Sequence, residues 1–240
     1  MLPSISVLAV SGTGDRSPQA ILQWAIDAYR GRIALACSFS GPTGMVALDM
    51  AMDIDRTIPV YVIDTGLLFP QTYALVERAA KRYRIEPVVV RAAISLEEQE
   101  RRYGRALWES DPDTCCRLRK VDPQREFLRG YAAWIAGIRR DQTPHRENLH
   151  AVSWDETFGL VKIAPFADWG EAQLWEYIRE RDVPYNALHD AGYPSIGCTH
   201  CTRAIAPGAG PRDGRWPGRP KTECGLHFGV REGASGRDQR

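Results

Sequence analysis

The chain lacks several features that would place a protein in a broad class at once. Among its 240 residues, no apolar run approaches the roughly 20 residues that a membrane-spanning helix needs. The formal net charge is only +1, which gives no general attraction to nucleic acid or to a membrane surface. The start of the chain has a short apolar stretch without a basic leader, so we predict no signal peptide there. We therefore expect a cytoplasmic protein that binds neither nucleic acid nor membranes.

Cysteine is scarce, and its placement is uneven. Disulfides are rare in a reducing compartment, so clustered cysteines indicate metal binding or catalysis instead. Four of the six form two close pairs, and Cys37, next to an apolar run, is predicted to be a small buried residue. The six are Cys37, Cys115, Cys116, Cys198, Cys201 and Cys224.

Strand and helix patterns alternate along most of the chain. We expect strands at 32–37, 57–64, 86–92 and 132–138, and helices at 17–30, 45–54, 69–84 and 169–182. Asp122 and Pro123 indicate the start of another helix, ending near Gly130, and a hairpin is expected over 151–155 and 159–165. This order predicts an α/β fold with a mostly parallel sheet flanked by helices.

The amino-acid composition changes after Cys201. Residues 202–240 include eight Gly and four Pro among 39 residues, a density that opposes regular structure. Seven Arg and one Lys outnumber two Asp and two Glu there. We therefore predict two parts: a nucleotide-binding α/β domain over 1–201, and a mobile C-terminal segment over 202–240 that carries Cys224.

A Ser/Gly-rich loop follows the first predicted strand, in CSFSGPTG at 37–44. Backbone N–H groups in such a loop, together with a helix N-terminus, bind anions, and ligands of open parallel sheets lie at this edge. Neither the P-loop nor the GxGxxG pattern is present, and taken alone the loop could equally be a tight turn. The next strand also ends in polar residues, Asp64 and Thr65, which favours a ligand crevice.

Two cysteine pairs can hold one metal centre, either tetrahedral zinc or an iron–sulfur cluster. Cys115 and Cys116 are adjacent, whereas Cys198 and Cys201 form CxxC. Neighbouring side chains point apart, which suits the separated iron corners of a 4Fe–4S cube better than a single zinc ion. Arg117, Arg119 and Lys120 follow the first pair and would offset a cluster's negative charge; otherwise they are a solvated helix face.

Arginines gather in two further segments. Arg139, Arg140 and Arg146 follow the strand at 132–138, and Arg212 and Arg215 lie in the C-terminal segment. Guanidinium forks match two oxygens of a phosphate or sulfate, although a run of charges is more often plain surface.

Together these segments resemble the assimilatory sulfonucleotide reductases of the phosphoadenylyl-sulfate reductase family, specifically the iron–sulfur type that reduces adenylyl sulfate. The matching segments occur in family order from about residue 37 to 227, and ECGLH combined with CC and CxxC is highly specific. They are SFSG (38–41), IDTG (63–66), CC (115–116), RRDQ (139–142), GC..C (197–201) and ECGLH (223–227). In two places the chain departs from the family: Pro42-Thr43-Gly44 replaces an acidic pair, and the loop after RRDQ is one residue shorter.

The resemblance implies an adenine nucleotide alpha hydrolase-like fold, thioredoxin as electron donor, and often a homo-oligomer. It implies a 4Fe–4S cluster on Cys115, Cys116, Cys198 and Cys201, Cys224 as nucleophile, and Lys120 between cluster and substrate. The remaining substrate-binding positions would be Ser38, Ser40, Gly41, Ile63, Gly137, Arg139, Arg146, Arg212, Arg215 and His227.

The expected reaction is reduction of adenylyl sulfate to sulfite and AMP through an S-sulfocysteine on Cys224, in assimilatory sulfate reduction. A mobile segment would let the thiol reach the substrate first and then thioredoxin. Because thioredoxin supplies both electrons, the cluster's task is expected to be electrostatic and structural. Alternatives are a reductase of the 3′-phosphorylated substrate, an ATP-dependent adenylating or thiolating enzyme of the same fold, and a zinc-stabilised nucleic-acid-binding module.

Overall fold

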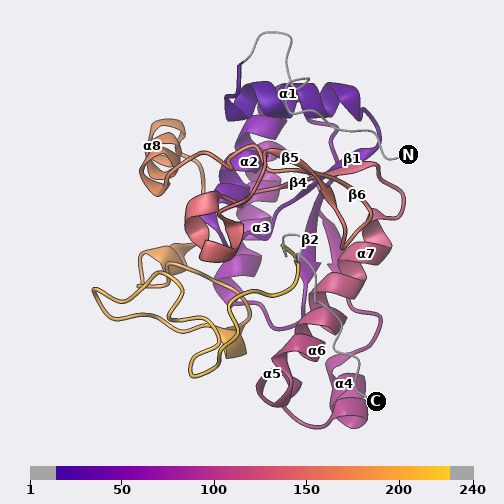
Figure 1. Ribbon diagram of the computed structural model, residues 1–240, viewed down its shortest axis with the longest axis vertical. Coiled ribbons are helices and arrows are strands. Elements are labelled where there is room, and N and C mark those ends of the chain that lie inside the picture. The colour runs from indigo at the N-terminus through magenta and orange to yellow at the C-terminus, as the bar shows by residue number, and fades with distance from the viewer. Residues whose placement is uncertain (1–14, 228–240) are drawn as a thin grey trace, which may run out of the picture.

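A single six-stranded sheet organises residues 15–227, the part of the chain that the computed structural model describes. Figure 1 shows this sheet at the centre of the molecule. Its strand order is β3-β2-β1-β4-β6-β5. β5 runs antiparallel to β6, and the other four pairings are parallel. The mostly parallel sheet predicted from the sequence is confirmed. The strands are β1 (Ile33–Ala36), β2 (Val60–Asp64), β3 (Val88–Arg91), β4 (Ala133–Ala136), β5 (Val152–Asp155) and β6 (Leu160–Ile163).

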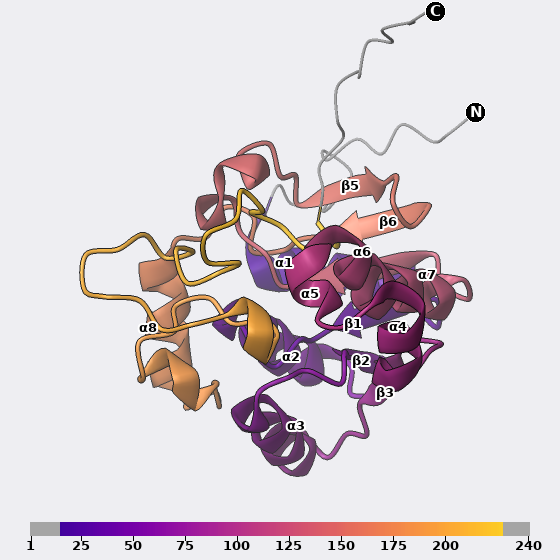
Figure 2. The same cartoon turned by 90° about the horizontal axis from the view of Figure 1, so that it is seen from below.

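Helices cover both faces of the sheet. Side chains of α1, α2, α3 and α8 share one hydrophobic core with β1, β2, β4 and β6, whereas α7 packs on the opposite face. Figure 2 shows α2 and α3 on the far side of the sheet from α7. The helices are α1 (Pro18–Ala28), α2 (Pro42–Ile54), α3 (Pro70–Tyr83), α4 (Leu96–Tyr103), α5 (Leu107–Ser110), α6 (Pro112–Cys116), α7 (Asp122–Leu128) and α8 (Glu171–Arg181).

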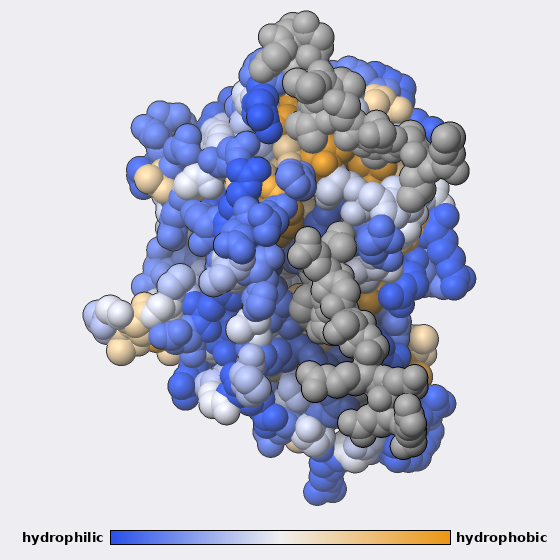
Figure 3. All heavy atoms as spheres, in the orientation of Figure 1, coloured by the Kyte–Doolittle hydropathy of each residue, from blue (hydrophilic) through white to orange (hydrophobic). Residues whose placement is uncertain are grey.

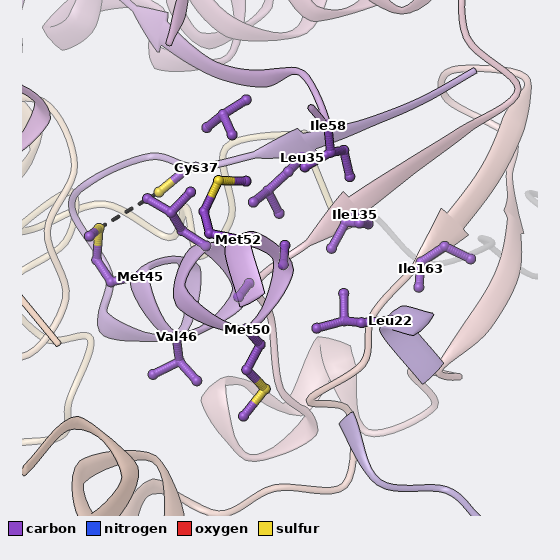
Figure 4. Close-up of a cluster of buried hydrophobic side chains, with 14 of the residues drawn as sticks. Leu22, Leu35, Cys37, Met45, Val46, Met50, Met52, Ile58, Ile135 and Ile163 are labelled. Carbon is purple, nitrogen blue, oxygen red and sulfur yellow. Dashed lines mark hydrogen bonds between the residues drawn. The ribbon is translucent and has the colours of Figure 1, made fainter. Parts of the chain in front are cut away.

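Cys37 belongs to the larger core, as predicted. Figure 4 shows its sulfur directed toward Met45 of α2, and the Sγ–Sδ distance is 3.8 Å. The side chain is 1% exposed, and burial raises the pKa of its thiol to about 12. Cys37 is therefore a packing residue and no candidate nucleophile.

One predicted helix boundary is wrong. Asp122 does not cap a new helix, because Val121 before it is already helical and the chain continues unbroken from α6 into α7. The join is a π-helical turn, η2 (Arg117–Val121), in which the N–H of Asp122 reaches the carbonyl of Arg117. Pro123 has no N–H to donate, and the wide π turn accommodates it. The helix ends at Leu128, close to the predicted end.

The described part of the C-terminal segment, 202–227, contains turns and an isolated bridge but no helix or strand. Figure 1 shows its yellow end turning back to the middle of the molecule. Trp216 in this segment is only 2% exposed, so it packs on the α/β domain. The division at residue 201 and the mobility of the segment stay predictions.

The surface drawn in Figure 3 is mainly hydrophilic, with hydrophobic residues gathered toward its upper end. None of the described helices is both long and apolar enough to cross a membrane. The prediction that the chain begins without a signal peptide concerns residues 1–14, which lie outside the described residues.

Candidate active site

A cavity of about 230 Å³ lies at the carboxyl ends of β1, β2 and β4. Ala36, Ile63 and Ala136, at or near the ends of these strands, form part of its wall. Ligands of open parallel sheets bind at this edge. The cavity brings together nearly all residues predicted to meet the substrate: Ser38, Ser40, Gly41, Ile63, Lys120, Gly137, Arg146, Arg212, Arg215, Cys224 and His227. Their individual roles stay predictions.

The loop after β1 forms one side of the cavity and starts α2. Gly41 is the N-cap residue of α2 and Pro42 takes its first position, so free N–H groups of the first turn lie at this edge. The loop is fixed from behind: Asn186 Nδ2 donates to the carbonyl of Phe39 at 3.1 Å, and His189 Nε2 lies 3.0 Å from the carbonyl of Ser40. A loop fixed in this way is suited to bind an anion without reorganising.

Gly137 is required by the close approach of β4 to α2. A Cβ built on Gly137 would lie 2.6 Å from Gly44 Cα and 2.7 Å from its N, and backbone atoms cannot yield as a flexible side chain can. We expect Gly137→Ala to lower the free energy of unfolding by about 1–3 kcal/mol through overpacking, measured by urea denaturation. Gly130→Ala is the matched control, since a Cβ there meets no atom within 4 Å. Equal stability of the two variants would contradict the steric explanation.

Arg139 is the predicted substrate-binding residue that does not line the cavity. Its buried side chain donates from Nη1 to Thr43 Oγ1 at 2.9 Å and pairs through Nε with Asp141 at 2.8 Å. Thr43 lies in the first turn of α2. Arg139 therefore lies behind the loop and supports the first turn of α2. Direct contact between Arg139 and the substrate stays a prediction.

The C-terminal segment folds back along the CxxC turn. Thr202 forms a β-bridge with Arg215, and the N–H of Trp216 donates to the carbonyl of Cys201 at 3.1 Å. These backbone contacts fix the segment that carries Arg212 and Arg215, two of the three arginines that line the cavity.

Ser195 joins those two arginines: its Oγ accepts from Arg215 Nη1 at 3.2 Å and from Arg212 Nη1 at 3.4 Å. A Cβ on Gly197 would lie 2.8 Å from Arg215 Cζ. Glycine at 197 therefore leaves the space that the guanidinium of Arg215 occupies.

Buried polar atoms without a hydrogen-bond partner among the described residues concentrate around this cavity. Burying such a donor costs about 1–3 kcal/mol, so their concentration indicates a ligand rich in acceptor oxygens. They are Tyr61 Oη, Gln124 Nε2, Trp134 Nε1, Trp216 Nε1, His227 Nδ1, and the Nε atoms of Arg146, Arg212 and Arg215.

Sequence patterns give no sign of three of these residues, Tyr61, Gln124 and Trp134. Tyr61 and Trp134 lie inside apolar strands and Gln124 inside a helix, where each resembles a packing residue. Their exposure to the cavity depends on the sheet twist and on the placement of α7, which no local pattern encodes.

The two cysteine pairs converge on a second, smaller cavity. Cys115, Cys116, Cys198 and Cys201 are all buried and all line it. The side chain of Asp111 caps α6, which places the first two on one helical turn. The CxxC turn is attached to the loop after β2, where the N–H of Thr199 donates to the carbonyl of Leu67 at 2.8 Å.

Hydrogen-bond donors surround this quartet of cysteines. Thr65 Oγ1 lies 3.4 Å from Cys198 Sγ, and the buried Nε1 of Trp108, which lines the cavity, has no partner among the described residues. His200, between the CxxC cysteines, stacks on Trp108 with ring centroids 4.1 Å apart. Polar groups near the sulfurs are typical of the surroundings of iron–sulfur ligands.

The donor set fits a bound cluster. Burial, reinforced by neighbouring thiolates, raises the pKa of the Cys115 thiol to about 11, and burial raises that of Cys116 to about 12. A bound metal centre would displace these protons and offset the cost of burying thiolates. Among residues 15–227, no three Cys, His, Asp or Glu side chains are grouped to hold a single metal ion.

Lys120 lines both cavities and lies between them. Burial alone would lower its pKa, but the nearby sulfurs of Cys198, Cys224 and Cys116 outweigh burial and raise it, so the ammonium form is held. Of the other two predicted cations, Arg119 also lines the cysteine cavity, although its hydrogen bonds go to other groups, and Arg117 does not line it. Arg119 donates to Gln99 and to the carbonyl of Ser95, and exposed Arg117 pairs with Asp122.

Cys224 lines the larger cavity and packs against a hydrophobic cluster that includes Trp216 and three of the four paired cysteines, Cys116, Cys198 and Cys201. Burial would raise the pKa of its thiol, but Lys120, the N–H of Leu226 and Arg215 together lower it. A lowered pKa increases the thiolate fraction and so the nucleophilic form.

His227 ends the described chain inside the same cavity. Its ring stacks on Trp134, with centroids 5.7 Å apart and planes 6° from parallel. Burial, together with the positive charges of Lys162, Arg146 and Arg212, holds its pKa well below the usual value. The imidazole is therefore neutral at pH 7 and is suited to pack or hydrogen-bond to a ligand.

The fold and the site define an α/β protein with an arginine-lined cavity at its strand ends, the Cys224 thiol in that cavity, and four cysteines around a smaller one. Within that class, the chain belongs to the phosphoadenosine phosphosulfate reductase domain family, whose model matches residues 32–204.

Named relatives agree with this family. The chain is 44% identical to an adenosine 5'-phosphosulfate reductase of Shouchella clausii, over 89% of this chain and 88% of that one. It is also 44% identical to a phosphoadenosine 5'-phosphosulfate reductase of Gloeobacter violaceus, over 89% of each chain. The phosphoadenylyl-sulfate reductase of Candida auris, solved as a phosphate complex, is 35% identical with a TM-score of 0.68, over 79% of this chain and 90% of that chain. The predicted adenine nucleotide alpha hydrolase-like fold is confirmed.

Proposed function

We propose that this protein reduces adenylyl sulfate to sulfite and AMP in assimilatory sulfate reduction, with Cys224 as nucleophile. One observation carries the proposal: Cys224 lines the same cavity as the loop at 38–41 and the arginines, and it also packs against a cluster that contains Cys116, Cys198 and Cys201. Relatives named for adenylyl-sulfate reduction, at about the same identity along most of the chain, support this substrate class.

Cys115, Cys116, Cys198 and Cys201 are proposed to hold a 4Fe–4S cluster. When bound, the cluster would supply a fixed electrostatic field beside the cavity and tie α6 to the CxxC turn. Lys120, which lines both cavities, would then face the substrate with its ammonium group. There it would bind the sulfate oxygens and stabilise the Cys224 thiolate.

The substrate is proposed to bind with its phosphate–sulfate group between the loop at Ser38–Gly41 and the arginines Arg146, Arg212 and Arg215. Ser38, Ser40 and the first N–H groups of α2 would donate to the phosphate. The backbone of Ile63 at the end of β2 would meet the adenine, with Gly137 beneath the nucleotide.

Chemistry follows in three displacements. The Cys224 thiolate attacks the substrate sulfur, an S–S bond forms, and the S–O bond breaks so that AMP leaves with the bridging oxygen. A thiolate of reduced thioredoxin then attacks the Cys224 sulfur, and sulfite leaves with the electron pair of the broken bond. The second thioredoxin thiol releases Cys224, and the thioredoxin disulfide accounts for the two electrons.

The second displacement requires Cys224 to face a bulky protein. The described segment that carries it contains turns rather than helix or strand, which supports the proposed movement. Homo-oligomer formation and a cytoplasmic location also stay predictions.

The test is product analysis with purified protein and reduced thioredoxin. We expect equal amounts of sulfite and AMP from adenylyl sulfate, and less sulfite when the same concentration of the 3′-phosphorylated substrate is supplied. A preference for the 3′-phosphorylated substrate would establish the alternative reductase. Pyrophosphate release from ATP without sulfite formation would contradict both and favour an adenylating enzyme of this fold.

A further inference from the structure

Glu223, immediately before Cys224, lies in an unusual place for an acid in an anion-binding site. Its side chain is 3% exposed and lines the cavity. Its carboxylate accepts from Arg146 Nη2 at 3.0 Å, lies 3.5 Å from Arg212 Nη2, and accepts from Thr143 Oγ1 at 3.2 Å. Two of the three arginines expected to bind the substrate are therefore paired with an acid of the protein's own chain.

The pairing uses the parts of the guanidinium groups that an anion needs. Arg146 donates from Nη1 to Gln142 and from Nη2 to Glu223, and its buried Nε has no hydrogen-bond partner within residues 15–227. Arg212 donates from Nη2 to the carbonyl of Thr222 and from Nη1 to Ser195, and its Nε is likewise buried. A phosphate or sulfate can bind these guanidinium groups only where the carboxylate of Glu223 leaves them, because two anions at one guanidinium group repel each other.

We propose that Glu223 is a positioning residue that competes with the anionic group of the substrate for Arg146 and Arg212. When the substrate takes the arginines, the carboxylate is displaced, and the adjacent Cys224 changes its place with it. When AMP and sulfite have left, the carboxylate again pairs with the arginines. The position of the nucleophile is thereby tied to occupancy of the cavity. This inference rests on the proposed function of the same cavity.

A second ion pair on the same segment provides a matched control. Lys221, two residues before Glu223, pairs with exposed Asp113 of α6. Asp113→Asn and Glu223→Gln each remove one negative charge from the attachment of this segment; the first removes one ion pair and the second removes two. Only Glu223→Gln releases Arg146 and Arg212 from their ion pairs. Among residues 15–227, Asp113 has no ion pair or hydrogen bond with either arginine.

The experiment is titration of each full-length holoprotein with AMP by calorimetry. We expect Glu223→Gln to bind AMP about tenfold more tightly than wild type, equivalent to about 1.4 kcal/mol of lost competition, and Asp113→Asn to bind like wild type. Steady-state assays should show a KM for adenylyl sulfate lowered by a similar factor without a rise in kcat. A residue that merely holds the fold would raise KM when it is lost.

Unchanged or weaker AMP binding by Glu223→Gln would overturn the inference, and so would equal tightening in Asp113→Asn, which would indicate a general charge effect. Glu223→Ala is the second variant, in case the amide of Gln retains the contact with Arg146. Failure of the proposed function would look different: the wild-type protein would form no sulfite. If wild type is active while Glu223→Gln binds AMP normally, the function stands and the competition does not.

Discussion

Cys224→Ser is expected to lower the rate of sulfite formation by at least about a thousandfold, because a serine hydroxyl does not ionise at neutral pH as this thiol can. The structure supports a large effect from a conservative change. Burial would raise the pKa of the Cys224 thiol, yet the positive charges of Lys120 and Arg215 and the N–H of Leu226 lower it. These groups are arranged for a thiolate and have no comparable effect on a hydroxyl.

The measurement that separates chemistry from binding is single-turnover mass spectrometry with adenylyl sulfate in the absence of thioredoxin. Wild type should gain the mass of one sulfite on the peptide containing Cys224, while Cys224→Ser should gain none and still bind AMP. Cys37→Ala serves as the control for loss of a cysteine, since Cys37 is buried in the core and should leave the adduct unchanged. An adduct on any residue other than Cys224 would contradict the mechanism.

Much of this site could be predicted from the sequence because its chemistry lies in short segments with fixed spacing. The loop at 38–41, the cysteine pairs and ECGLH each specify local geometry, and the alternation of strands and helices implies that strand ends meet at one edge. Residues from five distant segments were therefore expected near one another, and the cavity at β1, β2 and β4 brings them together.

What the sequence could not predict depends on three-dimensional packing. A proline such as Pro123 normally indicates the start of a helix, but here the π turn before it lets the helix continue. Lys120 lies in this π turn, between the two cavities. Arg139 shares the RRDQ segment with residues near the ligand, yet its guanidinium turns to Thr43. Glu223 has no motif of its own beyond its place in ECGLH, and its pairing with Arg146 requires segments 77 residues apart to meet.

Cys198→Ser is expected to abolish cluster binding, so that the purified protein loses both its brown colour and its iron. The sulfur of Cys198 is buried and lies 3.4 Å from Thr65 Oγ1, on the turn that joins the CxxC segment to the loop after β2. Serine is a poor ligand for iron, and three remaining thiols in a closed cavity offer no substitute for the fourth. Because the same turn supports Arg215 through the bridge to Thr202, loss of the cluster should also weaken the substrate site.

Visible absorbance, iron and acid-labile sulfide per chain, and zinc content measure this outcome directly. Wild type should contain iron and sulfide in the proportions of one 4Fe–4S cluster, and Cys37→Ala should match it, since Cys37 belongs to the larger hydrophobic core and does not line the cysteine cavity. A Cys198→Ser protein that keeps its iron would show that the four cysteines do not act together. Colourless wild-type protein that contains zinc would replace the proposed cluster with a structural zinc ion.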